Sequence, residues 1–391
     1  MGIVSPLGNN VADFRAGLET GRDGIGPITR FDAAAYAFRE AGEVGEVSLP
    51  EGYTGDAPTC DPARRFMLSA AQQAARDAGL AAGGDEHTGA VLATNFGEIA
   101  TAASLFSAVL EGEDMPPDAV RTCAFQSTAD AVAGHFGWHG PRAVLSLSCA
   151  SGTAAIGYAA DLVRSGRAAR VVAGGYDALS RFCWSGLGAL RTMTKEKVRP
   201  FDKNRSGTLF SEGAAALVLE DLAAARKRGA TLYAEVLGYA TNNNAYHMTA
   251  PAKEGRGSAE VMQAALAAAE CPPERVDHIN MHGTGTKYND VTETQAVKTV
   301  FGAHARAMPL TSIKAMTGHM MGAAGVAEAV AAVLTLRHGF VPPVIHYEEP
   351  DPACDLDYVV NQARPCRATV VLSNSAGIGG CNAAVLLGGV E

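Results

Sequence analysis

The sequence of 391 residues lacks the features that mark several common classes of protein. It has no CxxC pair among its eight cysteines, which excludes a disulfide framework or a cysteine-based zinc site and predicts reduced thiols. It has no run of lysines and arginines, and its net charge of −9 excludes a general nucleic-acid binder. It has no P-loop and no convincing GxGxxG motif after a strand, so nothing in it predicts a nucleotide cofactor.

A membrane span and a leader segment are not indicated either. The longest apolar stretch, residues 321–336, contains Glu328 and many small residues, which predicts a buried helix rather than a membrane span. No charged-then-apolar leader opens the sequence. Together with the scattered cysteines, these features predict a globular protein of the cytoplasm that does not enter the membrane.

What the sequence does contain is a regular alternation of apolar strands and helices. In the first half, strands are expected at 88–94, 169–175 and 214–220, between helices that include residues 62–79. The second half begins near Ala230 and continues the alternation to two final strands around the loop "AGIGG". This pattern predicts an α/β protein with largely parallel sheets that are covered by helices on both faces.

One pattern occurs twice. The segments "VLSLSCASGTAAIGYAADLV" and "LTSIKAMTGHMMGAAGVAEAVAAVL" each predict a strand, a short turn and a helix of unusually small residues. The repetition indicates a gene duplication with halves at 1–228 and 229–391, although two unrelated alanine-rich helices would give the same similarity.

Cys149 lies at the turn of the first of these segments. A short apolar strand precedes it and an alanine-rich helix follows, so the thiol is expected at a helix N-terminus. The positive end of the helix dipole favours a thiolate, which predicts a lowered pKa for this thiol. A single cysteine of this kind is more often a small buried hydrophobe, so its role depends on other residues.

Two histidines also lie where a regular element ends or begins. His282 follows an apolar strand directly, and His319 precedes the second small-residue helix, five residues after Lys314. Taken singly, each histidine would more often be a capping or core residue, and the lysine a solvated one.

Three acidic residues accompany them. Asp290 and Glu293 begin a helix and are interpreted as helix caps. Glu328 lies inside an apolar helix, where a carboxylate needs a partner.

Four motifs together give a stronger signal than any of these residues alone. The segments "SLSCASGTA", "HGTGTKYND", "KAMTGHMMGAAG" and "SNSAGIGGCNAA" occur in the order and approximate spacing of the β-ketoacyl-[acyl-carrier-protein] synthases. The chain resembles the Cys-His-His type, which comprises the bacterial synthase II and the ketosynthase subunits of type II polyketide systems. The resemblance extends over essentially the whole chain. It implies the duplicated thiolase fold, a five-layer α/β/α/β/α sandwich with the cysteine in one half and both histidines and the lysine in the other.

The resemblance also implies an activity and roles for the site residues. The enzyme would be an acyltransferase that condenses malonyl-carrier protein with an acyl group held on Cys149, with loss of CO₂. His282 and His319 would stabilise the enolate oxygen. Lys314 would fix His319 electrostatically, with Glu328 as the buried partner of the lysine.

Further roles concern the substrate. The backbone N–H groups of Cys149 and Ile378 would form a second oxyanion hole, and Thr284 and Thr286 would bind the phosphopantetheine arm. The resemblance implies no metal and no permanently bound cofactor, because the phosphopantetheine arrives on the carrier.

The implied partners are an acidic acyl carrier protein and a second subunit. The second subunit would be either an identical chain or a related ketosynthase or chain-length-factor chain. Arg64, Arg65 and Arg191 are expected to contact the carrier, and ordinary surface arginines are an equally good interpretation.

The chain departs from the family pattern at four places. The opening "MGIVSPLG" resembles the end of a strand whose beginning is missing. Ala376 and Ile378 replace two phenylalanines of the glycine-rich gate loop, Leu187 stands where a further pocket phenylalanine is common, and Ser211 replaces a frequent glycine. The smaller side chains predict an unusual acyl or polyketide chain and a changed acyl-gating step.

Three alternatives remain open. A thiolase would need a second catalytic cysteine, for which Cys381 is near enough to be considered. A synthase III would use a histidine and an asparagine and would take acyl-CoA. A chain-length-factor subunit would shape the pocket without catalysis, but such subunits usually lack the cysteine that this chain has.

Overall fold

The computed structural model describes residues 1–55, 60–80, 85–113 and 117–390. Its framework is a pair of five-stranded sheets. The first has the order β1-β7-β6-β4-β5 and comprises Gly2–Val4 (β1), Thr88–Ala93 (β4), Arg142–Leu145 (β5), Arg170–Asp177 (β6) and Gly213–Glu220 (β7). The second has the order β8-β14-β13-β9-β10 and comprises Glu235–Asn243 (β8), His278–Asn280 (β9), Leu310–Thr311 (β10), Val370–Ala376 (β13) and Cys381–Gly388 (β14).

The two sheets share one topology. In each sheet the first strand in chain order lies at an edge, antiparallel to the last strand, and the last strand is antiparallel to the fourth. The fourth strand is parallel to the second, and the second is parallel to the third. Because strand order and strand direction both repeat, the topology supports the duplication that the sequence indicated.

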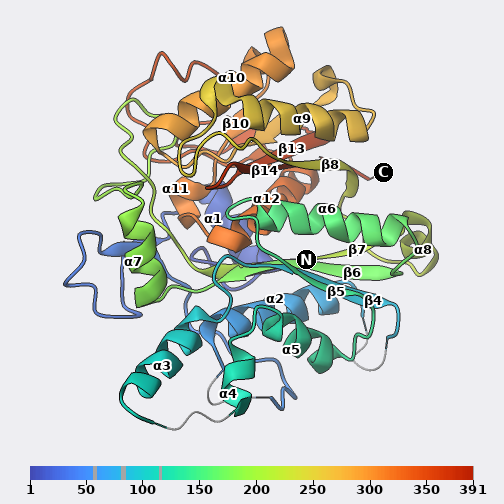
Figure 1. Ribbon diagram of the computed structural model, residues 1–391. Helices are drawn as coiled ribbons and strands as arrows, with labels where there is room; N and C mark the ends of the chain where they lie inside the picture. The colour runs from blue at the N-terminus through green and yellow to red at the C-terminus, as the bar shows by residue number, and fades with distance from the viewer. Residues whose placement is uncertain (56–59, 81–84, 114–116, 391) are drawn as a thin grey trace.

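Helices form three layers around the two sheets (Figure 1). The outer layers are α2 (Pro62–Asp77) with α5 (Ser127–Phe136), and α9 (Arg256–Ala268) with α10 (Lys287–Phe301). The middle layer, between the sheets, is formed by α6 (Ser151–Arg164) and α12 (Ala324–His338). The predicted α/β class and five-layer thiolase sandwich are therefore confirmed.

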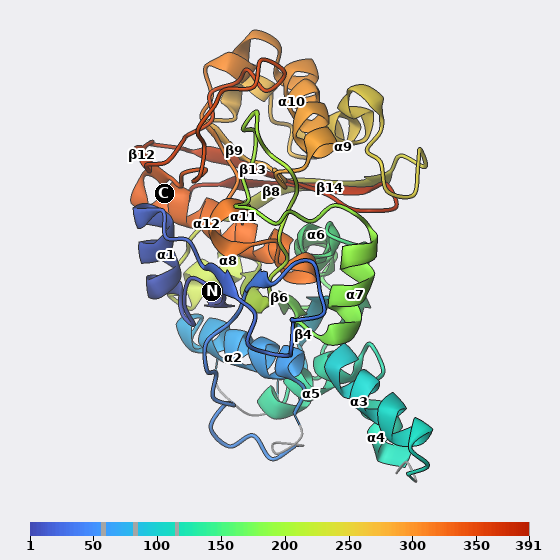
Figure 2. The ribbon, with the colours of Figure 1, turned by 90° about the vertical axis from the view of Figure 1, so that its left-hand side faces the viewer.

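The remaining elements lie around this sandwich. Figure 2 shows α3 and α4 extending away from the body of the molecule. The helices and strands that surround the sandwich are α1 (Val11–Thr20), β2 (Ile25–Pro27), β3 (Glu40–Gly42), α3 (Ile99–Leu110), α4 (Pro117–Thr122), α7 (Arg181–Ala189), α8 (Leu222–Lys227), α11 (Lys314–Thr317), β11 (Phe340–Val341) and β12 (Arg364–Pro365). Among the described helices, none combines the length and the apolar character that crossing a bilayer requires.

The small residues of the middle layer allow a close helix crossing. A Cβ atom added to Gly152 of α6 would lie 2.8 Å from the backbone nitrogen of Val326 in α12. A Cβ atom on Gly325 would collide with the backbone nitrogen of Thr153. Larger side chains would force the two helix starts apart. The alanine- and glycine-rich composition therefore brings the segments that carry Cys149 and His319 together.

The structure adds detail at the start of the chain. The opening "MGIVSPLG", which resembles the end of a strand, contains the three-residue strand β1, which pairs with β7 through Gly2, Ile3 and Val4. The helix α1 was not predicted; it begins after Asn10, whose side chain accepts a hydrogen bond from the Asp13 N–H. Asn10 is a typical N-cap residue, so this helix start was readable from the sequence.

Candidate active site

A sharp turn presents Cys149 between β5 and α6. Ser148, directly before it, has a φ of +52°, a left-handed conformation that non-glycine residues seldom adopt. The hydroxyl of Ser151 accepts a hydrogen bond from the Leu147 N–H at 2.7 Å and donates to the Ser148 carbonyl at 2.5 Å. This tight loop holds the cysteine just outside the first turn of α6, with the side chain 7% exposed.

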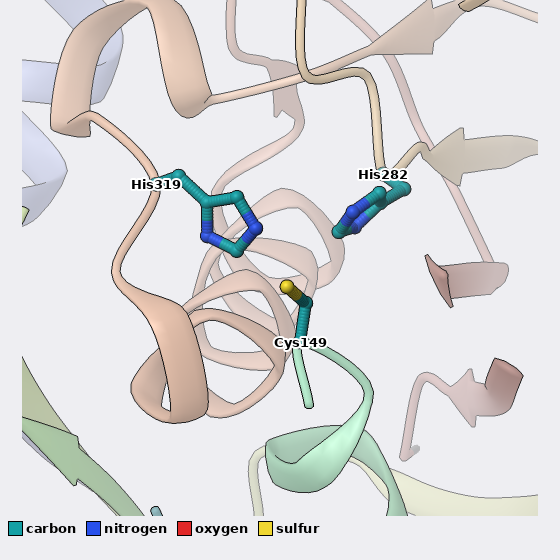
Figure 3. Close-up of side chains that lie close together, drawn as sticks. All are labelled: Cys149, His282 and His319. Atoms are coloured by element: carbon teal, nitrogen blue, oxygen red, sulfur yellow. The ribbon is translucent and has the colours of Figure 1, made fainter. Parts of the chain in front are cut away.

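Two imidazoles from distant segments meet this thiol (Figure 3). The Cys149 sulfur and one ring nitrogen each of His282 and His319 all lie within 4.8 Å of one another. The two rings are 5.4 Å apart between centroids and almost perpendicular, at 83°. All three side chains are buried, so the structure brings together the three residues that the motifs singled out.

His319 presents a free N–H to the site. Its Nδ1 accepts a hydrogen bond from the backbone N–H of Met321 at 3.1 Å, so in the neutral ring the proton is on Nε2. That Nε2 is buried and has no hydrogen-bond partner among the described residues. The backbone of His319 is paired with Leu209 and Ser211, which fixes the position of the ring. A buried donor that the fold leaves unpaired is suited to an oxygen of a substrate.

His282 is oriented by Lys314. The Lys314 ammonium lies 3.3 Å from His282 Nδ1 and donates to the His282 carbonyl at 2.7 Å. Because an ammonium only donates, Nδ1 accepts and the ring proton is on Nε2. Lys314 is 1% exposed and also pairs with Glu328, the buried partner that was expected.

Lys314 was expected to fix His319 electrostatically, but its hydrogen bonds go to His282 instead. The lysine lies five residues before His319, but the short helix α11 directs its side chain to His282. Its charge still acts on both rings, since it lowers the pKa of His282 and of His319.

Burial is the larger cause of these shifts. It lowers the pKa of both histidines well below the usual value, because the charged ring would lose its hydration. Both rings are therefore neutral near pH 7. They are suited to donate hydrogen bonds to a developing oxyanion rather than to supply a positive charge.

The thiol also differs from the expectation. Burial raises the pKa of Cys149 to about 11, although the charge of Lys314 and the backbone N–H of Ile378 act in the opposite direction. The prediction of a lowered pKa at the helix start is wrong, because the loss of hydration outweighs the stabilisation of the thiolate. The resting site thus contains a thiol beside two neutral imidazoles.

A pH series on Cys149 tests this conclusion. Because the thiolate is the reactive form, the rate of alkylation by iodoacetamide should rise about tenfold per pH unit from about pH 7 to about pH 10. The measurement is the alkylated fraction of the Cys149 peptide by mass spectrometry, over a pH range in which circular dichroism is constant. A rate that levels off at or below about pH 9, as for an ordinary cysteine, would contradict the raised pKa.

The glycine loop between β13 and β14 lies directly against Cys149. A Cβ atom on Gly377 would be 3.1 Å from the Cys149 backbone nitrogen and 3.1 Å from the Leu147 carbonyl oxygen. The backbone N–H groups of Ile378 and of Cys149 itself act to lower the pKa of the thiol, which indicates that both lie close to the sulfur. These are the two donors that the sequence suggested for a second oxyanion hole.

A cavity of about 360 Å³ leads to the three side chains. Thr284 and Thr286 line it, and their hydroxyls lie 2.9 Å apart. Ala376 and Ile378 also line it, as expected for gate-loop residues. Leu187 does not line this cavity directly: it is buried with Trp184 in the apolar cluster that also includes Phe210 of the cavity wall, because α7 turns that side inward.

The three arginines differ in position. Arg64 is 5% exposed and forms an ion pair with Glu98 at 2.7 Å, so the expectation of a carrier contact is wrong for this residue. Its α2 position faces the core instead of the surface. Arg65 is half-buried, and Arg191 is exposed at the rim of the cavity. A carrier contact stays a prediction for these two.

Two residues interpreted as helix caps have a further role. Glu293 accepts the backbone N–H of His282 at 2.7 Å and of Gly283 at 2.9 Å, and burial raises its pKa to about 7. Asp290 accepts the N–H groups of Thr284 and Gly285. Together they hold the loop that carries His282 and both threonines. Their position shortly after "HGTGT" was the feature of the sequence that could have indicated this role.

Asp177 has the same kind of role on the other side. This buried residue at the end of β6 accepts the Gly322 N–H at 2.7 Å and the Asn95 N–H at 3.0 Å. Burial raises its pKa to about 6. It joins the first sheet to the segment that follows His319, and nothing in its local sequence indicated this.

The arrangement combines a nucleophile with two sets of donors. A thiol, two neutral imidazole N–H groups and two backbone N–H groups surround one buried point. Such a site can form a thioester and stabilise an oxyanion beside it. A thiolate and two imidazoles are also possible metal ligands, so the geometry alone is compatible with either acyl transfer or metal binding.

Comparisons with known proteins cover both halves. The family model "Beta-ketoacyl synthase, N-terminal domain" matches residues 1–225, and "Beta-ketoacyl synthase, C-terminal domain" matches residues 233–348. The chain is 38% identical over 394 residues to 3-oxoacyl-[acyl-carrier-protein] synthase 2 of Synechocystis, covering 98% of this chain and 95% of the relative. It is 40% identical over 414 residues to the tetracenomycin polyketide synthase ketoacyl synthase alpha subunit of Streptomyces glaucescens, covering 99% and 95%.

Solved structures of ketosynthases are similar to the chain over its whole length. The chain superposes on the ishigamide ketosynthase/chain length factor with a TM-score of 0.92 at 34% identity, covering 100% of this chain and 98% of that one. It superposes with a TM-score of 0.89 at 32% identity on a type II polyketide synthase ketosynthase that was solved bound to the hexaketide, in complex with its acyl-carrier protein. That match also covers 100% of this chain and 98% of the other.

Proposed function

Because the chain belongs to the β-ketoacyl synthase family, we propose that it condenses malonyl-carrier protein with an acyl group held on Cys149. The enzyme is an acyltransferase whose product is a 3-oxoacyl-carrier protein. The observation that carries the assignment of roles is the meeting of Cys149, His282 and His319 within 4.8 Å in a buried cavity.

The first step is acyl transfer. The Cys149 sulfur attacks the thioester carbonyl of the acyl-carrier protein, the bond to the phosphopantetheine sulfur breaks, and the thiol proton leaves with that sulfur. The N–H groups of Cys149 and Ile378 bind the oxyanion that forms at this carbonyl. This hole needs only backbone groups, so it is independent of the side chain at position 378.

The second step uses the two imidazoles. The malonyl thioester loses CO₂, and the bonding electron pair passes to an enolate whose oxygen accepts from Nε2 of His282 and of His319. The enolate carbon then attacks the Cys149 thioester, and the cysteine sulfur leaves and regains a proton from solvent. Lys314, Glu328, Glu293 and Asp290 are positioning residues, because they hold the ring and the loop of His282.

The substrates arrive on a carrier in this proposal. A phosphopantetheine arm enters the cavity past Thr284 and Thr286, and no permanently bound cofactor or metal is required. The carrier would dock near the rim of the cavity, where Arg191 is exposed. We place the enzyme in the cytoplasm because its eight cysteines are scattered without a CxxC pair, a usage typical of a reducing compartment.

The second subunit is a copy of this chain or a chain-length-factor type of chain. Support comes from α3, which is apolar yet exposes Phe106 by 65% and Leu110 by 72%. β5 also lies at an edge of its sheet. An exposed apolar helix and an unpaired sheet edge are each typical of an interface.

The division at 228/229 and the pathway are also proposals. Each half would be one thiolase-like unit, since all strands of one sheet precede residue 221 and all those of the other follow residue 234. Relatives of fatty-acid and of polyketide type are almost equally similar. Ala376 and Ile378 line the cavity and are smaller than the phenylalanines of the family's gate loop. The space that they leave supports an acyl chain that is bulkier than a saturated fatty chain.

Intact-protein mass tests the proposed function. After incubation with a panel of acyl-carrier proteins, the chain should gain the mass of one acyl group, and Cys149→Ala should gain none. Adding malonyl-carrier protein should then discharge the adduct, release CO₂ and give 3-oxoacyl product, with or without EDTA. A chain-length-factor role predicts no adduct, and a thiolase predicts no CO₂. Turnover limited to saturated chains would contradict the proposed preference for a bulkier acyl group.

A further inference from the structure

Three residues that line the cavity each have a buried polar atom with no hydrogen-bond partner in the described part of the chain. One is Nε2 of His319, to which the mechanism assigns the enolate oxygen. The other two are the hydroxyl oxygens of Thr192 and Thr208, which the mechanism does not use. Thr208 is 2% exposed, so its hydroxyl gains little from bulk water. An unpaired buried hydroxyl costs free energy unless a ligand pairs it.

The two threonines are neighbours on one wall. The Thr208 N–H donates to the Thr192 carbonyl at 2.9 Å, so the two segments run side by side. Phe210 also lines the cavity, and its ring is 5.4 Å from the ring of His319. Phe210 is two residues from Thr208, so the segment that carries Thr208 also reaches the reaction centre. Arg191, next to Thr192, is exposed at the rim.

The wall with the Thr284–Thr286 pair is close by. A Cβ atom on Gly285 would lie 2.9 Å from the Gly207 carbonyl oxygen, so the segments that carry the two threonine pairs are in contact. The hydroxyls of Thr284 and Thr286 bond one another, whereas those of Thr192 and Thr208 do not. The cavity wall therefore carries two further threonine hydroxyls, which lack a partner in the described part of the chain and lie on segments close to the Thr284–Thr286 loop.

We propose that Thr192 and Thr208 form a subsite that hydrogen-bonds an amide of the phosphopantetheine arm. A hydroxyl both donates and accepts, which suits an amide, and neither side chain carries the charge that a carboxylate would favour. The thioester must reach Cys149 at the inner end of the cavity, so the section between rim and sulfur holds the arm. This inference rests on the proposed function, because it requires an arm-borne substrate. A carbonyl on the acyl chain offers the same chemistry, and the test separates the two sources.

The test compares the kinetics of Cys149 acylation for two thioesters of one acyl group. One is an acyl-pantetheine, and the other is the ethanethiol thioester, which has no amide. The variants Thr208→Val and Thr192→Val keep the shape of the side chain and remove its hydroxyl. Loss of one hydrogen bond should raise the KM for acyl-pantetheine about five- to tenfold, leave kcat unchanged and leave the ethanethiol thioester unaffected.

Thr292→Val is the matched control. Thr292 lines the same cavity, but its hydroxyl donates to the carbonyls of Tyr288 and Asn289, so neither KM should change. Thr208→Val should also unfold at the same or a higher temperature than the wild type, because it removes an unpaired hydroxyl. A lower unfolding temperature without a kinetic change would indicate a structural role and overturn the proposal.

The remaining outcomes are distinct. Unchanged KM for acyl-pantetheine in both valine variants would overturn the subsite. A KM increase that appears with both thioesters, and only when the acyl chain carries a keto group, would overturn the assignment to the arm. A wild-type chain that never acylates Cys149 would instead refute the proposed function, so the two failures are distinguishable.

Discussion

Replacing His319 with alanine is expected to reduce malonyl decarboxylation about a hundredfold or more, since removing one oxyanion donor typically costs that much. His282→Ala should have a similar effect. Acylation of Cys149 should continue in both variants, because the hole for that step consists of the backbone N–H groups of Cys149 and Ile378. The measurements are CO₂ release from malonyl-carrier protein and the mass of the acyl adduct.

The partial replacement His319→Gln sharpens this prediction. Its side-chain amide retains an N–H donor, so part of the decarboxylation should return. His338→Ala is the control, because that histidine is exposed and lies at the end of α12. If His319→Ala abolished acylation and decarboxylation equally, the separate oxyanion holes proposed for the two steps would be wrong.

Replacing Lys314 with methionine is expected to cost about 3–5 kcal/mol of folding free energy, because it leaves Glu328 buried without its partner. Activity should fall as well, since nothing would fix the tautomer of His282. Burial raises the pKa of Glu328 above its usual 4.5, and the charge of Lys314 opposes this. Without the lysine the folded carboxyl holds its proton more strongly. The variant should therefore be most stable below about pH 4.5 and lose stability as the pH rises.

Urea unfolding between about pH 4.5 and about pH 8 measures this slope. The double variant Lys314→Met with Glu328→Gln removes both charges, so it should recover much of the stability and lose the pH dependence. It should stay impaired in decarboxylation, because His282 still lacks its lysine. A double variant as unstable as Lys314→Met alone would show that the uncompensated carboxylate is not the cause.

The fold was accessible from the sequence because its signals are local. Alternating apolar strands and helices predicted the layered α/β architecture, and the two small-residue helices indicated the duplication that the strand order now supports. The helix α1 was overlooked although its Asn10 cap is a local signal too. The elbow at Cys149 was also predictable, because strand, turn and helix follow one another within 25 residues.

Pairings between distant segments were not accessible in this way. The family resemblance linked Lys314 to His319, but the lysine hydrogen-bonds His282, which is 32 residues away along the chain. Arg64 was expected to contact the carrier and instead pairs with the buried Glu98. Leu187 was expected to line the pocket and is instead buried in the cluster that includes Phe210 of the cavity wall. In each case the direction of a side chain depends on neighbouring elements that local pattern does not specify.

By itself, the sequence indicated which elements form, because periodicity and turns are properties of short segments, and its four motifs carried the family resemblance that implied a common site for the cysteine and the two histidines. Only the tertiary structure decided the chemical state of those groups. Burial raises the pKa of the Cys149 thiol and keeps both imidazoles neutral, against the local effect of the helix start. The tertiary structure also leaves the hydroxyls of Thr192 and Thr208 without a hydrogen-bond partner among the described residues. Hydration and hydrogen-bond partners are set by atoms packed around a group in three dimensions, and a linear pattern does not contain them.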